Sequence, residues 1–264
     1  MARILHLTDT HLRAAPELIA GRVDPRACLA RLAARLAALM PQIGPFDLCL
    51  LTGDLADLGT PAEYAALREG LSGLDAPLAV LPGNHDDRAA LAAAFPELGL
   101  PPEGPQDWCR DVGAVRVVGL DSVKPGVDHG ALSEQSLSFL ADRLAEAPDR
   151  PALVALHHPP FDTGIDFMDV IGLRNAAALA AAVVGHQAEL RIVCGHVHRH
   201  MTGMCGGWPV VIGPAVAHMI EADYRPDSPP AFTLEPGGCL IHEWDRGFRS
   251  THVFAGEAPG PYPF

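Results

Sequence analysis

Five short polar clusters contain the residue types that proteins use to bind metals, and each follows a hydrophobic run of the chain. The clusters are Asp9-Thr10-His11, Gly53-Asp54, Gly83-Asn84-His85-Asp86, His157-His158-Pro159-Pro160 and Gly195-His196-Val197-His198. Aspartate, asparagine and histidine supply oxygen and nitrogen ligands to divalent metals. A buried strand that ends in such a residue presents it at the carboxyl edge of its sheet, where α/β proteins build their sites. Five clusters in one chain therefore predict a metal centre.

The spacing within the clusters indicates how the side chains could converge. Asp9 and His11 are two residues apart, as are His196 and His198, so each pair would point to one side of an extended chain. Two neighbouring metal ions need a carboxylate that bridges them. Asp54 is the candidate, because it follows a glycine that would let the backbone approach the ions.

Predicted strands and helices separate the clusters. Apolar runs of strand length, each ending at a cluster, cover residues 3–8, 47–51, 77–81, 151–156 and 189–194. Apolar spacing and capping residues predict helices over 25–40, 60–71, 87–95, 133–147 and 175–184. The order strand, site, helix occurs three times before residue 96, which predicts an α/β protein with a mostly parallel sheet.

The C-terminal part has a different pattern. Further strands are predicted at 108–112 and 114–120, as a hairpin, and at 209–212, 239–244 and 248–254. Residues 224–236 are proline-rich and irregular, and the tail after Ala255 is expected to be an extended arm. We predict one domain over residues 1–264, in which about 201–264 supply the later strands, the roof of a pocket and the tail.

Composition limits the partners and the compartment. The formal net charge of −13 argues against a nucleic acid polymer or an anionic membrane as the main partner, because both need a basic surface. The six cysteines are scattered without a C-x-x-C pair, so neither a disulfide framework nor a cysteine zinc site is expected. With no signal-peptide pattern and no apolar run of membrane length, a cytoplasmic location is the expectation.

Together, the five clusters resemble the motifs of the calcineurin-like metallophosphoesterase family, over residues 9 to 198. The resemblance implies a four-layer α/β/β/α sandwich with two mixed β-sheets flanked by helices, and a two-metal centre at the strand ends. Within the family, the sequence is most similar to the bacterial class III cyclic nucleotide phosphodiesterases and the related glycerophosphodiesterases. Residues 8–11, 82–87 and 157–160 carry that similarity.

The resemblance also implies roles for individual residues. One metal would be held by Asp9, His11, Asp54 and His198, and the other by Asp54, Asn84, His157 and His196. The ions would be Fe, Mn, Zn or Co, since mixed oxygen and nitrogen ligands suit all four. Asn84, His85 and His218 would contact the substrate, with His85 as the catalytic acid; His218 lies in a segment that resembles the pocket-closing loop of the phosphodiesterases. Among the other histidines, His158 is expected to point away from the metals, and His6 to be a core residue or to support the site.

Departures from the family pattern exclude some relatives. Position 57 is aspartate, where purple acid phosphatases place a metal-binding tyrosine. Leu58 stands where the family's Ser/Thr protein phosphatases have an arginine, and Asp86 stands where they have a glutamate.

The predicted function is metal-dependent hydrolysis of small phosphodiesters, either 3′,5′-cyclic nucleotides or glycerophosphodiesters, by a hydroxide that the ions activate. His85 would protonate the leaving oxygen, and Asp86 or a backbone carbonyl would fix its tautomer. Alternatives are a phosphomonoesterase or nuclease of the same family, or a scaffold with a decayed site. All seven ligand positions hold competent residues, which argues against decay. A homodimer or higher homo-oligomer is also possible.

Overall fold

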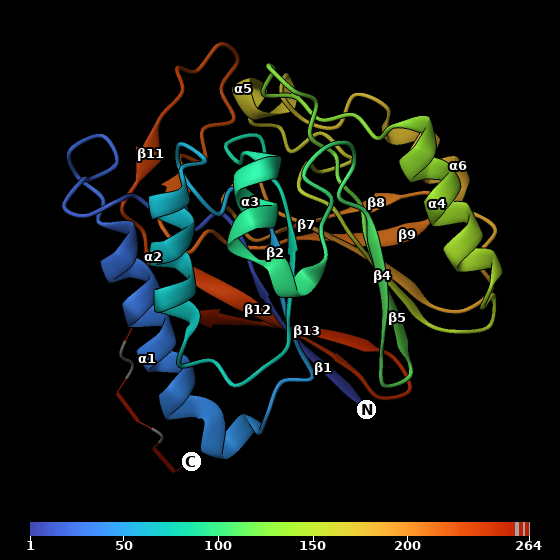
Figure 1. Cartoon of the computed structure of the whole chain (residues 1–264), viewed down its shortest axis with the longest axis horizontal. Helices are drawn as coiled ribbons and strands as arrows, with labels where there is room; N and C mark the ends of the chain where they lie inside the picture. The colour runs from blue at the N-terminus through green and yellow to red at the C-terminus, as the bar shows by residue number, and fades with distance from the viewer. Residues whose placement is uncertain (257–258, 261, 264) are drawn as a thin grey trace.

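The structure, a computed structural model, describes residues 1–256, 259–260 and 262–263. Within these residues, two large β-sheets pack face to face between two groups of helices (Figure 1). This four-layer arrangement confirms the predicted fold class. The arm expected after Ala255 includes residues 257, 258, 261 and 264, which lie outside the described residues.

The first sheet combines the N-terminal strands with the last two strands of the chain. Its order is β13 (Phe248–Phe254), β12 (Gly238–Trp244), β1 (Ala2–Leu7), β2 (Leu48–Thr52) and β3 (Leu78–Leu81). Strands β1, β2 and β3 are parallel, whereas β12 runs antiparallel to β1 and to β13. Helices α1 (Pro25–Ile43), α2 (Pro61–Leu71) and α3 (Arg88–Ala94) cover its outer face (Figure 1).

Helix boundaries follow the capping signals of the sequence, with one difference. The Asp24 side chain accepts hydrogen bonds from the first backbone N–H groups of α1, and Thr60 and Glu63 form a capping box on α2. Helix α1 was predicted to stop before Pro41 but continues to Ile43, with Pro41 inside its last turn. It ends at Gly44, whose φ of 71° the missing side chain permits.

The second sheet has the order β4 (Trp108–Val112), β5 (Val115–Gly119), β6 (Ala152–Ala155), β7 (Leu190–Cys194), β9 (Trp208–Ile212) and β8 (Met201–Cys205). The predicted hairpin is β4–β5, and the edge strand β8 was not predicted. Helices α4 (Glu134–Ala145) and α6 (Ala176–Val183) cover the outer face (Figure 1). The remaining elements are η1 (Pro96–Leu98), α5 (Asp166–Asp169) and the hairpin β10 (Met219–Ile220) with β11 (Phe232–Thr233), of which β11 lies in the segment predicted to be irregular.

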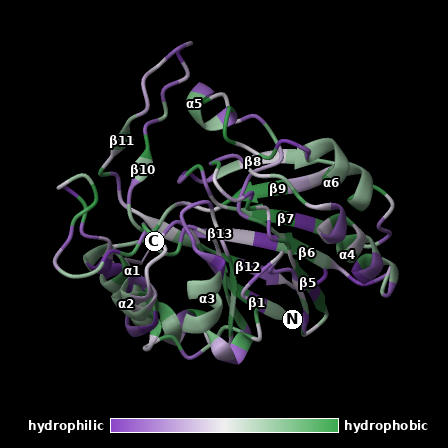
Figure 2. Cartoon of the chain, turned by 45° about the horizontal axis from the view of Figure 1, so that its top comes forward, coloured by the Kyte–Doolittle hydropathy of each residue, from purple (hydrophilic) through white to green (hydrophobic). Residues whose placement is uncertain are grey.

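Three apolar layers hold these elements together, one between each sheet and its helices and one between the two sheets. The layer between the sheets includes Ile4, Leu50, Val117 and Val193. Figure 2 shows the matching distribution, with hydrophobic residues concentrated in the strands and hydrophilic residues in the loops. Among the described residues, the helices are all too short or too polar to cross a membrane.

Candidate metal centre

Four predicted ligands gather where β1, β2 and β7 end. The ligand atoms of Asp9, His11, Asp54 and His198 all lie within 4.8 Å of one another, and all four residues are buried. His11 Nε2 lies 3.1 Å from His198 Nε2 and 3.6 Å from Asp54 Oδ2. His198 Nε2 lies 3.4 Å from Asp9 Oδ1. These distances leave room for one ion between the four side chains.

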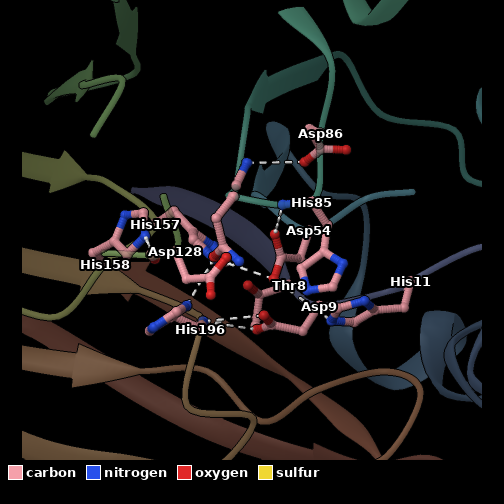
Figure 3. Close-up of polar contacts among 12 residues, drawn as sticks. Thr8, Asp9, His11, Asp54, His85, Asp86, Asp128, His157, His158 and His196 are labelled. Atoms are coloured by element: carbon pink, nitrogen blue, oxygen red, sulfur yellow. Dashed lines mark hydrogen bonds and ion pairs between the residues drawn. The ribbon is translucent and has the colours of Figure 1, made fainter. Parts of the chain in front are cut away.

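A second group lies on the other side of Asp54. His157 Nε2 is 3.4 Å from Asp54 Oδ2, 3.2 Å from Asn84 Oδ1 and 3.2 Å from His196 Nδ1. Figure 3 shows the side chains of Asp54, His157 and His196 reaching toward one another from different segments of the chain. Because Asp54 Oδ2 faces both His11 and His157, it is the oxygen that the two groups share.

Five of these residues have a left-handed backbone. The φ angles are 52° at Asp9, 42° at His11, 50° at Asp54, 72° at His196 and 58° at His198. Only three other non-glycine residues among the described ones have positive φ. The structure therefore brings Asp9 and His11 together, but the extended backbone assumed for them was wrong. The chain curls tightly at each ligand, at a cost of roughly 1–2 kcal/mol per residue.

Glycines let the loops of the centre pack closely. A Cβ atom at Gly53 would lie 2.5 Å from His157 Nδ1 and 2.7 Å from the backbone nitrogen of Gly83. A Cβ atom at Gly83 would lie 2.2 Å from Asp54 Oδ1, and one at Gly195 would lie 1.9 Å from the hydroxyl of Thr8. Gly53 thus makes room for a neighbouring loop and the His157 ring, rather than for the ions as expected from the sequence.

Hydrogen bonds fix which nitrogen of His157, His198 and His11 faces the centre. His157 Nδ1 donates to the carbonyl of Thr52 at 2.8 Å, and His198 Nδ1 donates to that of His218 at 2.9 Å. A neutral ring carries one proton, so the Nε2 atom of each keeps a lone pair directed inward. His11 Nδ1 faces the Asp57 carboxylate at 3.2 Å, which leaves its Nε2 in the same state. Lone pairs 3.1 Å apart on His11 and His198 repel unless a cation lies between them, so the donor set fits a metal.

Burial opposes charge on most of the groups. It raises the pKa of Asp9 to about 6 and lowers that of His198 to about 3. Burial also disfavours the protonated form of His157, but the Asp54 carboxylate outweighs it and raises the pKa of His157 to about 9. In the metal-free protein a proton on His157 therefore balances Asp54. A metal must displace that proton, which makes metal binding pH-dependent.

The Asp86 carboxylate binds the loops that follow β2 and β3, and it does not bind the His85 ring. Its carboxylate accepts hydrogen bonds from the backbone N–H groups of Leu55, Ala56 and Gly83 at 2.9–3.1 Å, and from the hydroxyl of Tyr64 at 2.9 Å. These contacts tie the loop after β2 to the loop after β3. Of the two partners expected for His85, the structure therefore shows the backbone carbonyl.

His85 itself is exposed at the rim of the centre. Its Nδ1 atom donates to the carbonyl of Asp57 at 2.9 Å, and its backbone N–H donates to Asp54 Oδ1 at 3.0 Å. The His85 ring meets the His11 ring edge-on, with centroids 4.7 Å apart. His85 thus lies beside His11 and Asp57, and one ligand atom of each of these three residues lies within 4.8 Å of the others.

Sequence reasoning missed Asp57 as a member of the site. Its carboxylate faces His11 Nδ1, its second oxygen lies 3.2 Å from Arg13 Nε, and its carbonyl receives the His85 ring. The sequence signal for Asp57 was its position three residues after Asp54. That position was used only to exclude the purple acid phosphatases.

Two further histidines border the centre. His158 lies beside His157 and His196, but its ring nitrogens contact the hydroxyl of Ser122 at 2.8 Å and the carbonyl of Asp128 at 3.0 Å. Both nitrogens are engaged, so His158 is not free to bind a metal. The His218 ring is 4.6 Å from the His198 ring, and its Nδ1 atom is buried without a hydrogen-bond partner in the described residues.

This fold and this set of side chains define a metal-dependent phosphoesterase. The sequence matches the family model of the calcineurin-like phosphoesterases over residues 2–200, and the chain belongs to that family. It is 32% identical to a probable glycerophosphodiester phosphodiesterase of Arcobacter nitrofigilis, over 99% of this chain and 96% of the relative. It is 36% identical to the 3′,5′-cyclic adenosine monophosphate phosphodiesterase of Escherichia coli K12, over 75% of this chain and 70% of the relative. A dimetal phosphatase of Danio rerio shares the fold, with a TM-score of 0.64 and 12% identity over 97% of this chain and 99% of that one.

Proposed function

We propose that this chain hydrolyses small phosphodiesters at a centre of two divalent or transition-metal ions. The observation that carries the proposal is the position of Asp54 Oδ2 between two groups of ligand atoms. The first ion would be held by Asp9, His11, Asp54 and His198, and the second by Asp54, Asn84, His157 and His196. Both curated relatives named above are phosphodiesterases, which supports a diester as substrate. Fe, Mn, Zn and Co all suit this set of ligands.

The ions would neutralise the phosphoryl oxygens and lower the pKa of the attacking water. His85 protonates the leaving oxygen in this proposal. Because its Nδ1 atom donates to the carbonyl of Asp57, only Nε2 faces outward, and a neutral ring has no proton there. The form of His85 that can donate from Nε2 is therefore the doubly protonated ring, which keeps its Nδ1 proton on the carbonyl of Asp57.

A cavity of about 510 Å³ adjoins Asn84 and would take the leaving group. Its walls include residues 86–89, 102–104 and 123–128. Arg88 in this wall is already paired with Asp121 at 2.6 Å, so it does not offer a free charge to a polyanion. Pockets of this size hold small molecules. His218 would contact the substrate, as the resemblance implies, and the segment 224–236 would form the roof of the pocket.

Two wider expectations remain predictions. A homodimer or higher homo-oligomer would be tested by light scattering, and a cytoplasmic location by fractionation of the source cells.

The test compares kcat/KM for bis-nitrophenyl phosphate, cyclic AMP, a glycerophosphodiester, nitrophenyl phosphate and single-stranded DNA at fixed metal and salt. Diesters of low molecular mass should exceed both the monoester and DNA. The control is Asp54→Ala protein purified in the same way, which excludes a contaminating phosphatase. A tenfold advantage for DNA or the monoester, about 1.4 kcal/mol of transition-state preference, would overturn the proposal.

A further inference from the structure

A row of polar side chains crosses the inner face of the first sheet. Ser250, His242, His6 and Thr52 come from β13, β12, β1 and β2, which are neighbours in that order. His6, His242 and Thr52 are at most 1% exposed. An apolar cluster fills much of this layer between the sheets, and burying a polar group beside it is unfavourable unless the group is hydrogen-bonded. The proposed chemistry uses none of these side chains directly.

Hydrogen bonds connect the row without a gap. Arg191 on the facing strand β7 donates to the hydroxyl of Ser250 at 2.7 Å. Ser250 Oγ lies 2.7 Å from His242 Nδ1, and His242 Nε2 lies 3.1 Å from His6 Nδ1. His6 Nε2 lies 2.8 Å from the hydroxyl of Thr52. Each histidine therefore uses both ring nitrogens within the row.

The hydrogen bonds of the row require His6 and His242 to have the same tautomer. Burial lowers the pKa of His6 to about 3 and that of His242 well below its usual range, so both rings are neutral. A neutral ring has one N–H group, and one proton lies between His242 Nε2 and His6 Nδ1. If His242 carries its proton on Nε2, His6 Nδ1 must accept it, so His6 carries its own proton on Nε2. If His242 carries its proton on Nδ1, its Nε2 must accept from His6 Nδ1, so His6 carries its proton on Nδ1. The two rings therefore share one tautomer.

The row ends at the peptide group that orients a proposed metal ligand. The carbonyl of Thr52 accepts the Nδ1 proton of His157 at 2.8 Å. Gly53 follows with a φ of 95°, and Asp54 with a φ of 50°. The carbonyl belongs to the last residue of β2, and the Thr8 hydroxyl also donates to it at 3.4 Å. Glycine restrains the backbone least of all residues, so the Thr52 side chain is a further anchor for this peptide group. Its hydroxyl has His6 as its partner.

We propose that His6 and His242 are positioning residues for His157. Through Thr52 they hold the His157 ring in the orientation and tautomer in which Nε2 faces Asp54 and Asn84. The inference rests on the proposed metal centre, and it assigns a role to a part of the layer between the sheets that does not touch the ions.

The test uses substitutions that separate the row from the fold. Thr52→Val removes the hydroxyl but keeps the carbonyl and the side-chain shape. His6→Leu breaks the row, whereas His6→Gln keeps an amide that can reach Thr52. The matched control is Thr251→Val, next to Ser250 on β13 but exposed.

Two measurements are made on each protein. Calorimetric titration of metal-free protein with Mn²⁺ gives the affinity for each ion. Two-bond ¹H–¹⁵N spectra of the metal-free protein give the tautomers of the neutral His6 and His242 rings and show whether His157 keeps a slowly exchanging proton on Nδ1. Thr52→Val and His6→Leu should weaken binding of one ion about 10–100-fold and leave the other within about threefold. His6→Gln and Thr251→Val should match the wild type. The wild type should show His6 and His242 in the same tautomer, and His157 should lose its slowly exchanging Nδ1 proton in Thr52→Val.

A merely structural role predicts a lower melting temperature with both affinities unchanged, and that result would overturn the inference. Opposite tautomers of His6 and His242 would overturn it as well. Should His6→Leu fail to fold, Thr52→Val decides alone. Absence of Mn²⁺ binding in the wild type would count against the proposed centre instead, while the His157 spectra would still decide the positioning role.

Discussion

The substitution Asp57→Asn tests how much the contact between the Asp57 carboxylate and the His11 ring contributes to metal affinity. The two carboxylate oxygens of Asp57 lie 3.2 Å from His11 Nδ1 and 3.2 Å from Arg13 Nε. Both partners are donors, and each has its own oxygen. Asparagine offers one oxygen and one NH₂ group, so one of the two contacts becomes donor against donor, and the negative charge beside His11 disappears.

The expected loss follows from the place of His11 in the site. Removing the outer partner of a metal-bound histidine lowers metal affinity about 10–100-fold, or about 1.4–2.7 kcal/mol. His11 belongs to only one of the two proposed ligand groups, so only one ion should be affected. The carbonyl of Asp57, which receives the His85 ring, is unchanged by the substitution. At saturating metal, kcat should therefore fall by less than the affinity does.

The assay is a calorimetric Mn²⁺ titration of the metal-free variant, followed by kcat at saturating Mn²⁺. Asp75→Asn is the control, because Asp75 is exposed and its substitution removes the same charge. Unchanged affinity for both ions would refute the reasoning, and so would a kcat loss that exceeds the affinity loss.

The remaining predictions concern Asp54, His11, His85 and His6. Asp54→Ala should lose both ions whereas His11→Ala keeps one, and elemental analysis that finds wild-type metal content in Asp54→Ala would remove Asp54 from the bridge. His85→Ala should retain metal but lower kcat by roughly 10²–10⁴, with a smaller loss for nitrophenolate leaving groups; an equal loss for good and poor leaving groups would assign His85 to phosphate positioning. Burial lowers the pKa of His6 from 6.5 to about 3, so below pH 6.5 the unfolded chain binds a proton that the folded one does not. Metal-free wild type should therefore lose up to about 1.4 kcal/mol of stability per pH unit relative to His6→Gln between pH 6.5 and 3; urea unfolding that shows a constant difference would contradict this.

The proposed ligand residues could be selected from the sequence because their signal is local. Each lies within a few residues of the end of an apolar strand. The conformation of these residues could not be found, since a positive φ at His11 or His198 depends on long-range contacts. The backbone N–H of His11, for example, bonds to the carbonyl of Asp54, which lies on another loop.

Some of the contacts that sequence reasoning missed are made by backbone groups, which every residue has. Thr52 and Asp57 each orient a histidine with a backbone carbonyl, which leaves no mark on residue type. Strand β13 was predicted with its observed bounds, yet nothing in its local pattern shows that β12 pairs with β1 at the other end of the chain. Strand β8 was missed because its segment is partly exposed at the edge of a sheet and has no clear apolar run.

The left-handed backbone at the five proposed ligand positions makes stability of the fold and metal binding favour different residues. At His11 or His198, glycine would relieve up to about 1 kcal/mol of strain even after its own entropic penalty is subtracted. Mutations that favour a stable fold alone would therefore tend to empty these positions of ligands. A lineage that had stopped using the centre would gain stability by losing it. The histidines and aspartates at these five positions therefore cost the fold some stability, which binding of a metal would offset.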